Sequence, residues 1–259
     1  MRKRVPGWVV PALVWAMAPV AATGQVESME VPLRVADDRL VVPVDIGHGV
    51  EVDFIVSTGN AVTVLNQAFI DNHGADGEFW LGDVEVNMDR YATVSNEDLN
   101  PDGGMVVGIV GANTLNEFDV LFDVPNSRLV LQTVGPEVEW DGVTLGQPID
   151  LRVYRGVLLT VDLDVVGHSI QALIDTGTGR VVGNPPLGEK LFIPEGEQGS
   201  TTLTFGGRDI DVRVHTRDLP LFERFDPQGN GFAILGASMT YDCAWSISWA
   251  HGELRMCER

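Results

Sequence analysis

The chain has 259 residues, 44% of them hydrophobic and 21% charged, which suits one large or two small globular domains and excludes a disordered chain. Its formal net charge of -20 would repel nucleic acid and anionic membranes, so we expect no nucleic-acid partner. The 29 glycines and 14 prolines favour short strands and turns over long helices.

The first 22 residues have the pattern of a signal peptide. Arg2, Lys3 and Arg4 form a basic start, residues 5–20 are mostly apolar and uncharged, and Val20-Ala21-Ala22 offers small residues to a signal peptidase. An uncleaved membrane anchor is the alternative, but the segment is short for a span and contains prolines. We therefore expect export to the periplasm or the extracellular space, and no stable membrane span.

The first half of the mature chain, residues 31–134, is predicted to be built of short β-strands. Residues 40–46 are rich in Val and Leu, and residues 83–88 alternate polar and apolar side chains, the period of a half-buried strand. An apolar strand ends in Ser57-Thr58-Gly59, where the glycine permits a tight turn. One short helix is expected in this half, just after Gly111.

Residues 135–147 contain a proline and further glycines, and we interpret them as a linker. The second half, residues 148–259, is predicted to be a second set of strands with one short helix, after Gly236. Its apolar strand ends in Asp175-Thr176-Gly177, and residues 201–214 read as a hairpin that turns at Gly206-Gly207.

Both cysteines of the chain, Cys243 and Cys257, lie near the C-terminus. They flank a strand-like run, a turn at Ala250-His251-Gly252 and a second strand-like run. A hairpin would place the two cysteines opposite each other, within bridging range. An exported protein permits a disulfide, so we predict this bridge; two buried thiols are the alternative.

The two halves read as an internal duplication. Residues 54–59 align with 172–177 at the same offset that relates Leu33 to Leu151, without a gap. Farther along, residues 108–112 align with 233–237 at a second constant offset. Two ungapped registers in the same order are poorly explained by chance. The first register places Ser57 opposite Asp175.

Each half therefore has an apolar strand, a Ser-Thr-Gly or Asp-Thr-Gly turn, a middle hairpin, and two apolar residues with Gly before a short helix. In this pattern the chain resembles the aspartic peptidases, in particular the retropepsin-like group, in a single-chain, pepsin-like arrangement. The resemblance covers residues 31–259. It implies an all-β, bilobal fold of two duplicated β-barrel lobes, with a cleft between them at whose base the two loops meet.

The resemblance also implies roles for the residues around the loops. Thr58 and Thr176 would cross-bond beneath the site, and the segments that end in Gly111 and Gly236 would pack beside the loops. A hairpin within residues 82–93 would cover the cleft as a flap. Tyr91 would lie near the tip of this flap or serve in packing.

The same resemblance implies a reaction that needs two carboxyl groups sharing one proton, one to activate water and the other to protonate the substrate. Asp175 supplies one carboxyl, whereas Ser57 offers a hydroxyl that does not titrate in that range. Without a like charge beside it, Asp175 is expected near the ordinary pKa of about 3.9, subject to burial. Asp53 lies roughly 13 Å back along an extended strand, too far to replace Ser57.

Two functions therefore stay open. The chain is an aspartic-type endopeptidase that hydrolyses peptide bonds through Asp175, or an inactive pseudo-peptidase that binds extended peptides in the cleft. Both imply a peptide or protein ligand, a monomer and no cofactor. Ser57 lacks the Gly-x-Ser-x-Gly elbow of serine hydrolases, and the five histidines are scattered. The sequence also lacks the His-Glu-x-x-His motif and ligand-spaced cysteines, so no metal is expected.

Overall fold

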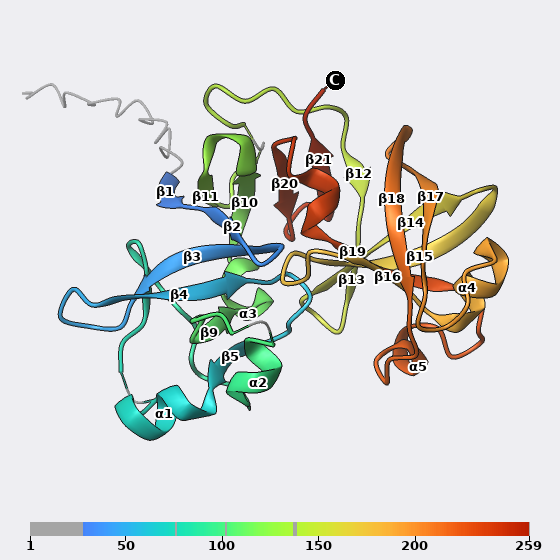
Figure 1. Cartoon of the computed structure of the whole chain (residues 1–259). Coiled ribbons are helices and arrows are strands. Elements are labelled where there is room, and N and C mark those ends of the chain that lie inside the picture. The colour runs from blue at the N-terminus through green and yellow to red at the C-terminus, as the bar shows by residue number, and fades with distance from the viewer. Residues whose placement is uncertain (1–27, 76, 102, 137–138, 259) are drawn as a thin grey trace, which may run out of the picture.

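The computed structural model describes residues 28–258 except residues 76, 102, 137 and 138 (Figure 1). The predicted signal peptide, residues 1–22, lies outside the described residues. The fold is all-β, as predicted, and its strands form three sheets. Two of these sheets are barrel-like and each belongs to one half of the chain.

The sheet of the first half has the strand order β7-β6-β3-β4-β9-β5-β8, with β2 paired to β3. The strands of this sheet are β2 (Arg34–Ala36), β3 (Arg39–Asp45), β4 (Glu51–Val56), β5 (Thr63–Asn66), β6 (Trp80–Leu81), β7 (Val84–Glu85), β8 (Tyr91–Val94) and β9 (Gly108–Val110). The sheet of the second half has the order β13-β14-β15-β19-β16-β18-β17 and is closed by a β14–β17 pairing. Its strands are β13 (Arg152–Tyr154), β14 (Leu158–Val165), β15 (His168–Asp175), β16 (Val181–Gly183), β17 (Gln198–Phe205), β18 (Arg208–Thr216) and β19 (Phe232–Gly236).

The two sheets share one topology, so the internal duplication of the sequence is also a duplication of structure. In the first half β4 runs parallel to β9, and β5 runs antiparallel to β9 and parallel to β8. In the second half β15 runs parallel to β19, and β16 runs antiparallel to β19 and parallel to β18. The strands that carry Ser57 and Asp175 therefore occupy equivalent central places in their sheets.

A third, six-stranded sheet joins the halves, and the sequence did not predict it. It has the order β1-β11-β10-β20-β21-β12. Its strands are β1 (Ser28–Pro32), β10 (Phe118–Asp123), β11 (Arg128–Thr133), β12 (Ile149–Asp150), β20 (Trp245–Ser248) and β21 (Glu253–Met256). The central contact pairs β10 of the first half with β20 of the second, where the rings of Phe122 and Trp245 stack at a centroid distance of 4.5 Å. The two halves thus share one β-sheet and one hydrophobic core.

The predicted linker crosses this shared sheet. Trp140 is buried against Leu121 and Val130, and the Gly146 N–H donates to the carbonyl of Met256 at 2.7 Å. Residues 135–147, as far as they are described, thus contribute buried contacts to the joint between the halves.

The helices only partly follow the prediction. The short helix after Gly111 is α3 (Ala112–Leu115), and Gly236 is followed by a 3₁₀ turn, η2 (Ala237–Thr240). The expectation of a single helix in each half is wrong. The additional helical segments are α1 (Gln67–His73), α2 (Asn96–Leu99), α4 (Pro185–Leu191), α5 (Phe222–Phe225) and the 3₁₀ turn η1 (Val124–Asn126). The side chains of Asn66, Ser95 and Asn184 cap the N-termini of α1, α2 and α4. These cap residues indicate helix starts in the sequence, but the surrounding residues have a strand-like pattern.

The predicted strand at residues 83–88 is also shorter than expected, because only Val84–Glu85 (β7) is strand. Beyond this strand the Asn87 N–H donates to the Thr114 hydroxyl at 3.0 Å instead of to a neighbouring strand. The hairpin at residues 201–214 is confirmed as β17 and β18, turning at Gly206-Gly207.

The disulfide prediction is confirmed. Cys243 and Cys257 flank the β20–β21 hairpin, their Cα atoms are 5.6 Å apart, and their sulfurs are bonded. In the part of the chain that the structure describes, no helix has the length and apolar character needed to cross a membrane.

Candidate active-site junction and interlobe groove

The loops that follow β4 and β15 meet where the two halves join. Ser57 is fully buried and its hydroxyl donates to Oδ1 of Asp175 at 2.7 Å. Ser57 directly follows β4 and Asp175 is the last residue of β15; each of these strands runs parallel to a central partner, so the two side chains emerge at equivalent points. The structure thus brings together the two residues that the sequence alignment placed opposite each other.

Thr58 and Thr176 fasten the two loops by four reciprocal hydrogen bonds. The Thr58 hydroxyl donates to the carbonyl of Ile174 at 2.8 Å and accepts from the Thr176 N–H at 3.2 Å. The Thr176 hydroxyl donates to the carbonyl of Val56 at 2.8 Å and accepts from the Thr58 N–H at 3.1 Å. Both threonines are buried, so the bonds are shielded from water. The structure therefore places both threonines as the resemblance implies.

The Ser57 hydroxyl stands where one oxygen of a carboxylate would stand. Asp175 Oδ1 accepts from the N–H of Gly177, two residues on, at 2.8 Å, and Ser57 Oγ accepts from the N–H of Gly59 at 3.2 Å. Ser57 Oγ also accepts from the backbone N–H and side-chain amide of Asn60, at 3.1 and 2.8 Å. The serine thus reproduces the inner hydrogen bonds of an aspartate but has no second oxygen to offer.

Gly59 and Gly177 each face the key side chain of the opposite loop. A Cβ on Gly59 would lie 2.3 Å from Asp175 Cγ, and a Cβ on Gly177 would lie 2.7 Å from Ser57 Cβ. Any side chain at either position would push the loops apart, so the close approach of the halves explains both glycines.

Gly111 and Gly236 lie beside the loops, where the resemblance placed them. A Cβ on Gly111 would be 2.4 Å from the backbone of Val62, and one on Gly236 would be 2.3 Å from the Arg180 carbonyl oxygen. The residues that follow these glycines hold the loops directly. Ala112 N–H donates to Asn60 O at 2.7 Å, and Ala237 N–H donates to Thr178 O at 2.8 Å.

Burial raises the pKa of Asp175, and the hydrogen bonds from Ser57, Gly177 and Gly59 only partly offset it. The net pKa lies above the ordinary value. The sequence predicts a pKa near the ordinary value, subject to burial, and burial decides the direction of the shift. Removing water from around the carboxyl disfavours its charged form even though no second carboxyl lies beside it.

The segment predicted as a flap lies elsewhere. At the β6–β7 turn a Cβ on Gly82 would be 2.6 Å from the Met29 sulfur, and the Asp83 N–H points at the same sulfur, 2.8 Å away. This turn therefore packs on β1 of the shared sheet, and its assignment to the flap is wrong. Tyr91 begins β8, where it pairs with Thr63, and its side chain is largely exposed.

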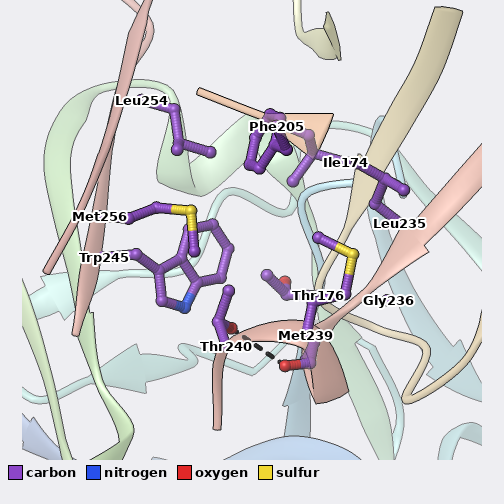
Figure 2. Close-up of a pocket in the computed structure, with 11 residues that line it drawn as sticks. Ile174, Thr176, Phe205, Leu235, Gly236, Met239, Thr240, Trp245, Leu254 and Met256 are labelled. Atoms are coloured by element: carbon purple, nitrogen blue, oxygen red, sulfur yellow. Dashed lines mark hydrogen bonds between the residues drawn. The ribbon is translucent and has the colours of Figure 1, made fainter. Parts of the chain in front are cut away.

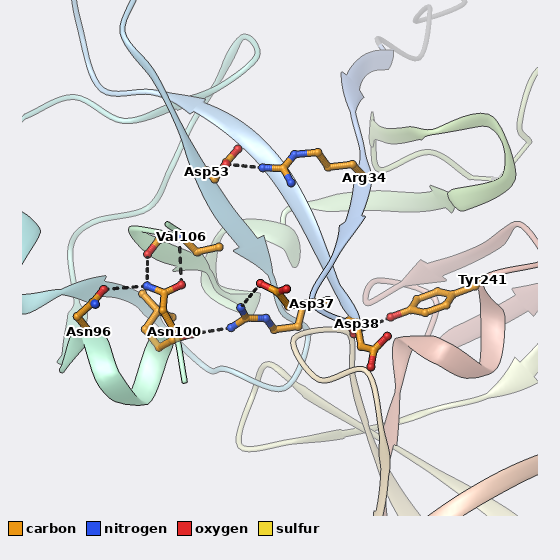
Figure 3. A network of polar contacts seen from close by, with 10 residues as sticks. Arg34, Asp37, Asp38, Asp53, Asn96, Asn100, Val106 and Tyr241 are labelled. Atoms are coloured by element: carbon orange, nitrogen blue, oxygen red, sulfur yellow. Dashed lines mark hydrogen bonds and ion pairs between the residues drawn. The ribbon is translucent and has the colours of Figure 1, made fainter. Parts of the chain in front are cut away.

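Asp53 is partly exposed and forms an ion pair with Arg34 (Figure 3). It therefore takes no part in the Ser57–Asp175 junction. Among the described residues, no group of three or more His, Cys, Asp and Glu side chains could hold a metal ion.

A polar groove of about 580 Å³ opens beside the Asp175 loop, and its walls come from both halves. One wall is the β2–β3 turn with Asp37, Asp38 and Arg39; another is the loop from Gly177 to Arg180. A second hollow of about 360 Å³ shares Asp38, Arg180 and His215 with it. These groove residues could not be predicted from the sequence, because no local motif marks the β2–β3 turn as part of a site.

The β2–β3 turn is held firmly across the joint between the halves. The Tyr241 hydroxyl donates to the carbonyl of Asp38 at 2.6 Å (Figure 3). The Arg39 guanidinium donates to the carbonyl of Leu99 at 2.6 Å. A Cβ on Gly179 would lie 1.9 Å from the Asp38 carbonyl oxygen, so the turn lies directly on the loop that follows Asp175. The groove is therefore a preformed feature of the interface.

Beneath the loops lies a separate apolar cavity of about 20 Å³, lined by Thr176, Met239 and Trp245 among others (Figure 2). That volume is on the scale of a single water molecule. It is too small for a peptide side chain.

No protein-family model matches the chain, and no curated protein matches it.

Proposed function

We propose that this chain is a catalytically silent protein of the aspartic-peptidase fold, which binds an extended peptide in the groove between its two halves. The observation that carries the proposal is the buried Ser57 hydroxyl, which donates to Asp175 Oδ1 at 2.7 Å. The duplicated topology and the reciprocal Thr58–Thr176 bonds support the fold assignment.

Chemistry at this junction lacks a second acid. Peptide hydrolysis by a carboxyl pair uses one group to take a proton from water and the other to protonate the substrate. Ser57 cannot titrate in the same range, and its single proton is already donated to Asp175. Loss of one acid–base partner typically costs about 10²–10⁴-fold in rate.

Ser57 is equally unsuited to act as a nucleophile. Its oxygen accepts three hydrogen bonds, from the Gly59 N–H and from two N–H groups of Asn60. It is also fully buried, so a substrate carbonyl could not approach it without the loops parting. A structural hydroxyl that keeps the loops joined accounts for both features.

Binding, in contrast, needs only the groove. The two adjoining hollows of about 580 and 360 Å³ lie within the range of ligand-binding clefts. They carry exposed polar side chains from both halves, which could fix the side chains of an extended segment. Hydrolysis through Asp175 is the competing function, because its carboxyl is intact and the residue as a whole keeps some exposed surface.

A peptide-library digest over acid to neutral pH separates the two functions. We expect no cleavage by the wild type beyond that of Asp175→Ala, and cleavage by Ser57→Asp, which restores a carboxyl at the junction. Wild-type cleavage that disappears in Asp175→Ala would overturn the proposal. Ser57→Ala is the matched control, because it removes the hydroxyl without adding an acid, and each variant is first checked for cooperative unfolding.

A further inference from the structure

A basic stripe lines the groove on the side of the second half. Arg213 and His215 on β18, and Arg217 directly after it, alternate with buried residues, so their side chains point to the same outer face. Arg180 joins them, because it directly precedes β16, whose Val182 pairs with His215. We define these four residues as the basic stripe; each lines at least one of the two adjoining hollows.

The three arginines of the stripe are exposed and form no ion pair within the part of the chain that the structure describes. Among the other described arginines, Arg34, Arg39, Arg128, Arg152 and Arg255 pair with acidic side chains, whereas Arg90, Arg155, Arg208 and Arg224 do not. The chain holds 37 acidic residues against 17 Lys and Arg, so acidic partners are abundant. Three neighbouring arginines without one therefore leave donors available to a ligand.

The acidic side chains of the groove only partly offset this charge. Asp37 lies 3.6 Å from Arg39, which neutralises it. Asp211 accepts a hydrogen bond from Thr202 on β17 at 2.8 Å. Asp38 is exposed and is held through its backbone by Tyr241, so its carboxylate and that of the exposed Asp211 are negative charges that face a ligand. Locally the groove is net positive on a protein whose formal net charge is -20.

We propose that the groove selects peptides that carry acidic side chains, whose carboxylates the basic stripe binds. The proposal rests on the peptide-binding function above and adds the class of ligand. Guanidinium groups suit it, because their planar donor pairs match a carboxylate and hold it with two hydrogen bonds. A nucleic acid fits less well, because its long run of phosphates would face the acidic remainder of the surface.

The test is fluorescence anisotropy of the full chain with three labelled eight-residue peptides that share one alanine-based frame. They carry two glutamates, two lysines or two glutamines at the same positions. We expect the glutamate peptide to bind most tightly, with about a two- to fivefold loss for each ion pair removed. Arg180→Glu and Arg217→Glu should invert the preference, and added salt should weaken it.

Two further variants sharpen the test. Asp38→Asn removes one opposing charge and should tighten binding of the glutamate peptide. Arg90→Glu is the matched control: Arg90 is exposed, has no ion-pair partner among the described residues and lines neither hollow. It should leave the preference for the glutamate peptide unchanged.

The outcomes separate this inference from the proposed function. If all three peptides bind equally, the selection for acidic side chains is wrong while peptide binding stands. If Arg90→Glu weakens the glutamate peptide as much as Arg217→Glu does, the effect is one of overall charge and the basic stripe is not the site. If none of the peptides binds, both proposals fail.

Discussion

Thr58→Val should strongly destabilise the joint between the halves. Valine keeps the volume of threonine but removes the hydroxyl that donates to Ile174 O at 2.8 Å and accepts from the Thr176 N–H at 3.2 Å. Both backbone groups would then lose these partners in a buried place. Each such group costs about 1–3 kcal/mol, so the expected loss is about 2–6 kcal/mol, a large share of the ~5–15 kcal/mol that stabilises a typical domain.

Urea unfolding followed by circular dichroism measures this loss. Thr176→Val, its mirror in the other half, should lose a similar amount, because it removes the bonds to Val56 O and from the Thr58 N–H. The double variant should lose less than the sum, because the two side chains share one network. Thr240→Val is the matched control: Thr240 is buried, but its hydroxyl donates only within its own turn, to Ala237 O at 2.9 Å. A Thr58→Val loss no greater than that of Thr240→Val would refute the reasoning.

Three further predictions concern buried or hydrogen-bonded carboxylates. Asp175→Asn should be more stable than the wild type at neutral pH, because burial raises the Asp175 pKa; the gain should vanish below about pH 3.9 in urea unfolding. Burial alone would raise the Asp226 pKa, but N–H donors, among them Asn230, Gly231 and Asn184, outweigh it and lower the pKa. Asp226→Asn should therefore lower the free energy of unfolding by about 1–3 kcal/mol at neutral pH. This difference from the wild type should shrink as the pH falls below about 3.9 and through the lowered pKa of Asp226 in the folded state. A difference that stays constant with pH would contradict the prediction. Asp119 is fully buried and its carboxyl oxygens have no hydrogen-bond partner among the described residues, so Asp119→Asn should raise the unfolding temperature.

The duplication carried most of what could be predicted about the site. The ungapped register placed Ser57 opposite Asp175, and the structure joins their side chains at 2.7 Å. The disulfide followed from a local hairpin, because Cys243 and Cys257 need only one turn to meet. The additional helices escaped notice, although the cap residues Asn66, Ser95 and Asn184 marked their starts.

The shared sheet and the groove could not be predicted in this way. Alternation along a strand identifies its buried face but not the strand that pairs with its edge, so the contact between β10 and β20 was invisible in the sequence. The flap assignment failed for the same reason, since the edge on which the Gly82 turn packs belongs to β1.

The sequence by itself determined which residues meet at the junction, because a repeated pattern folds twice into the same strands and turns. Alternation from residue 213 to 217, at the end of β18, likewise places Arg213, His215 and Arg217 on one face. Only the tertiary structure shows which part of the chain lies opposite that face. The turn at Asp38 docks on Gly179, from the other half of the chain, and this contact between distant segments turns an exposed strand face into the wall of a groove.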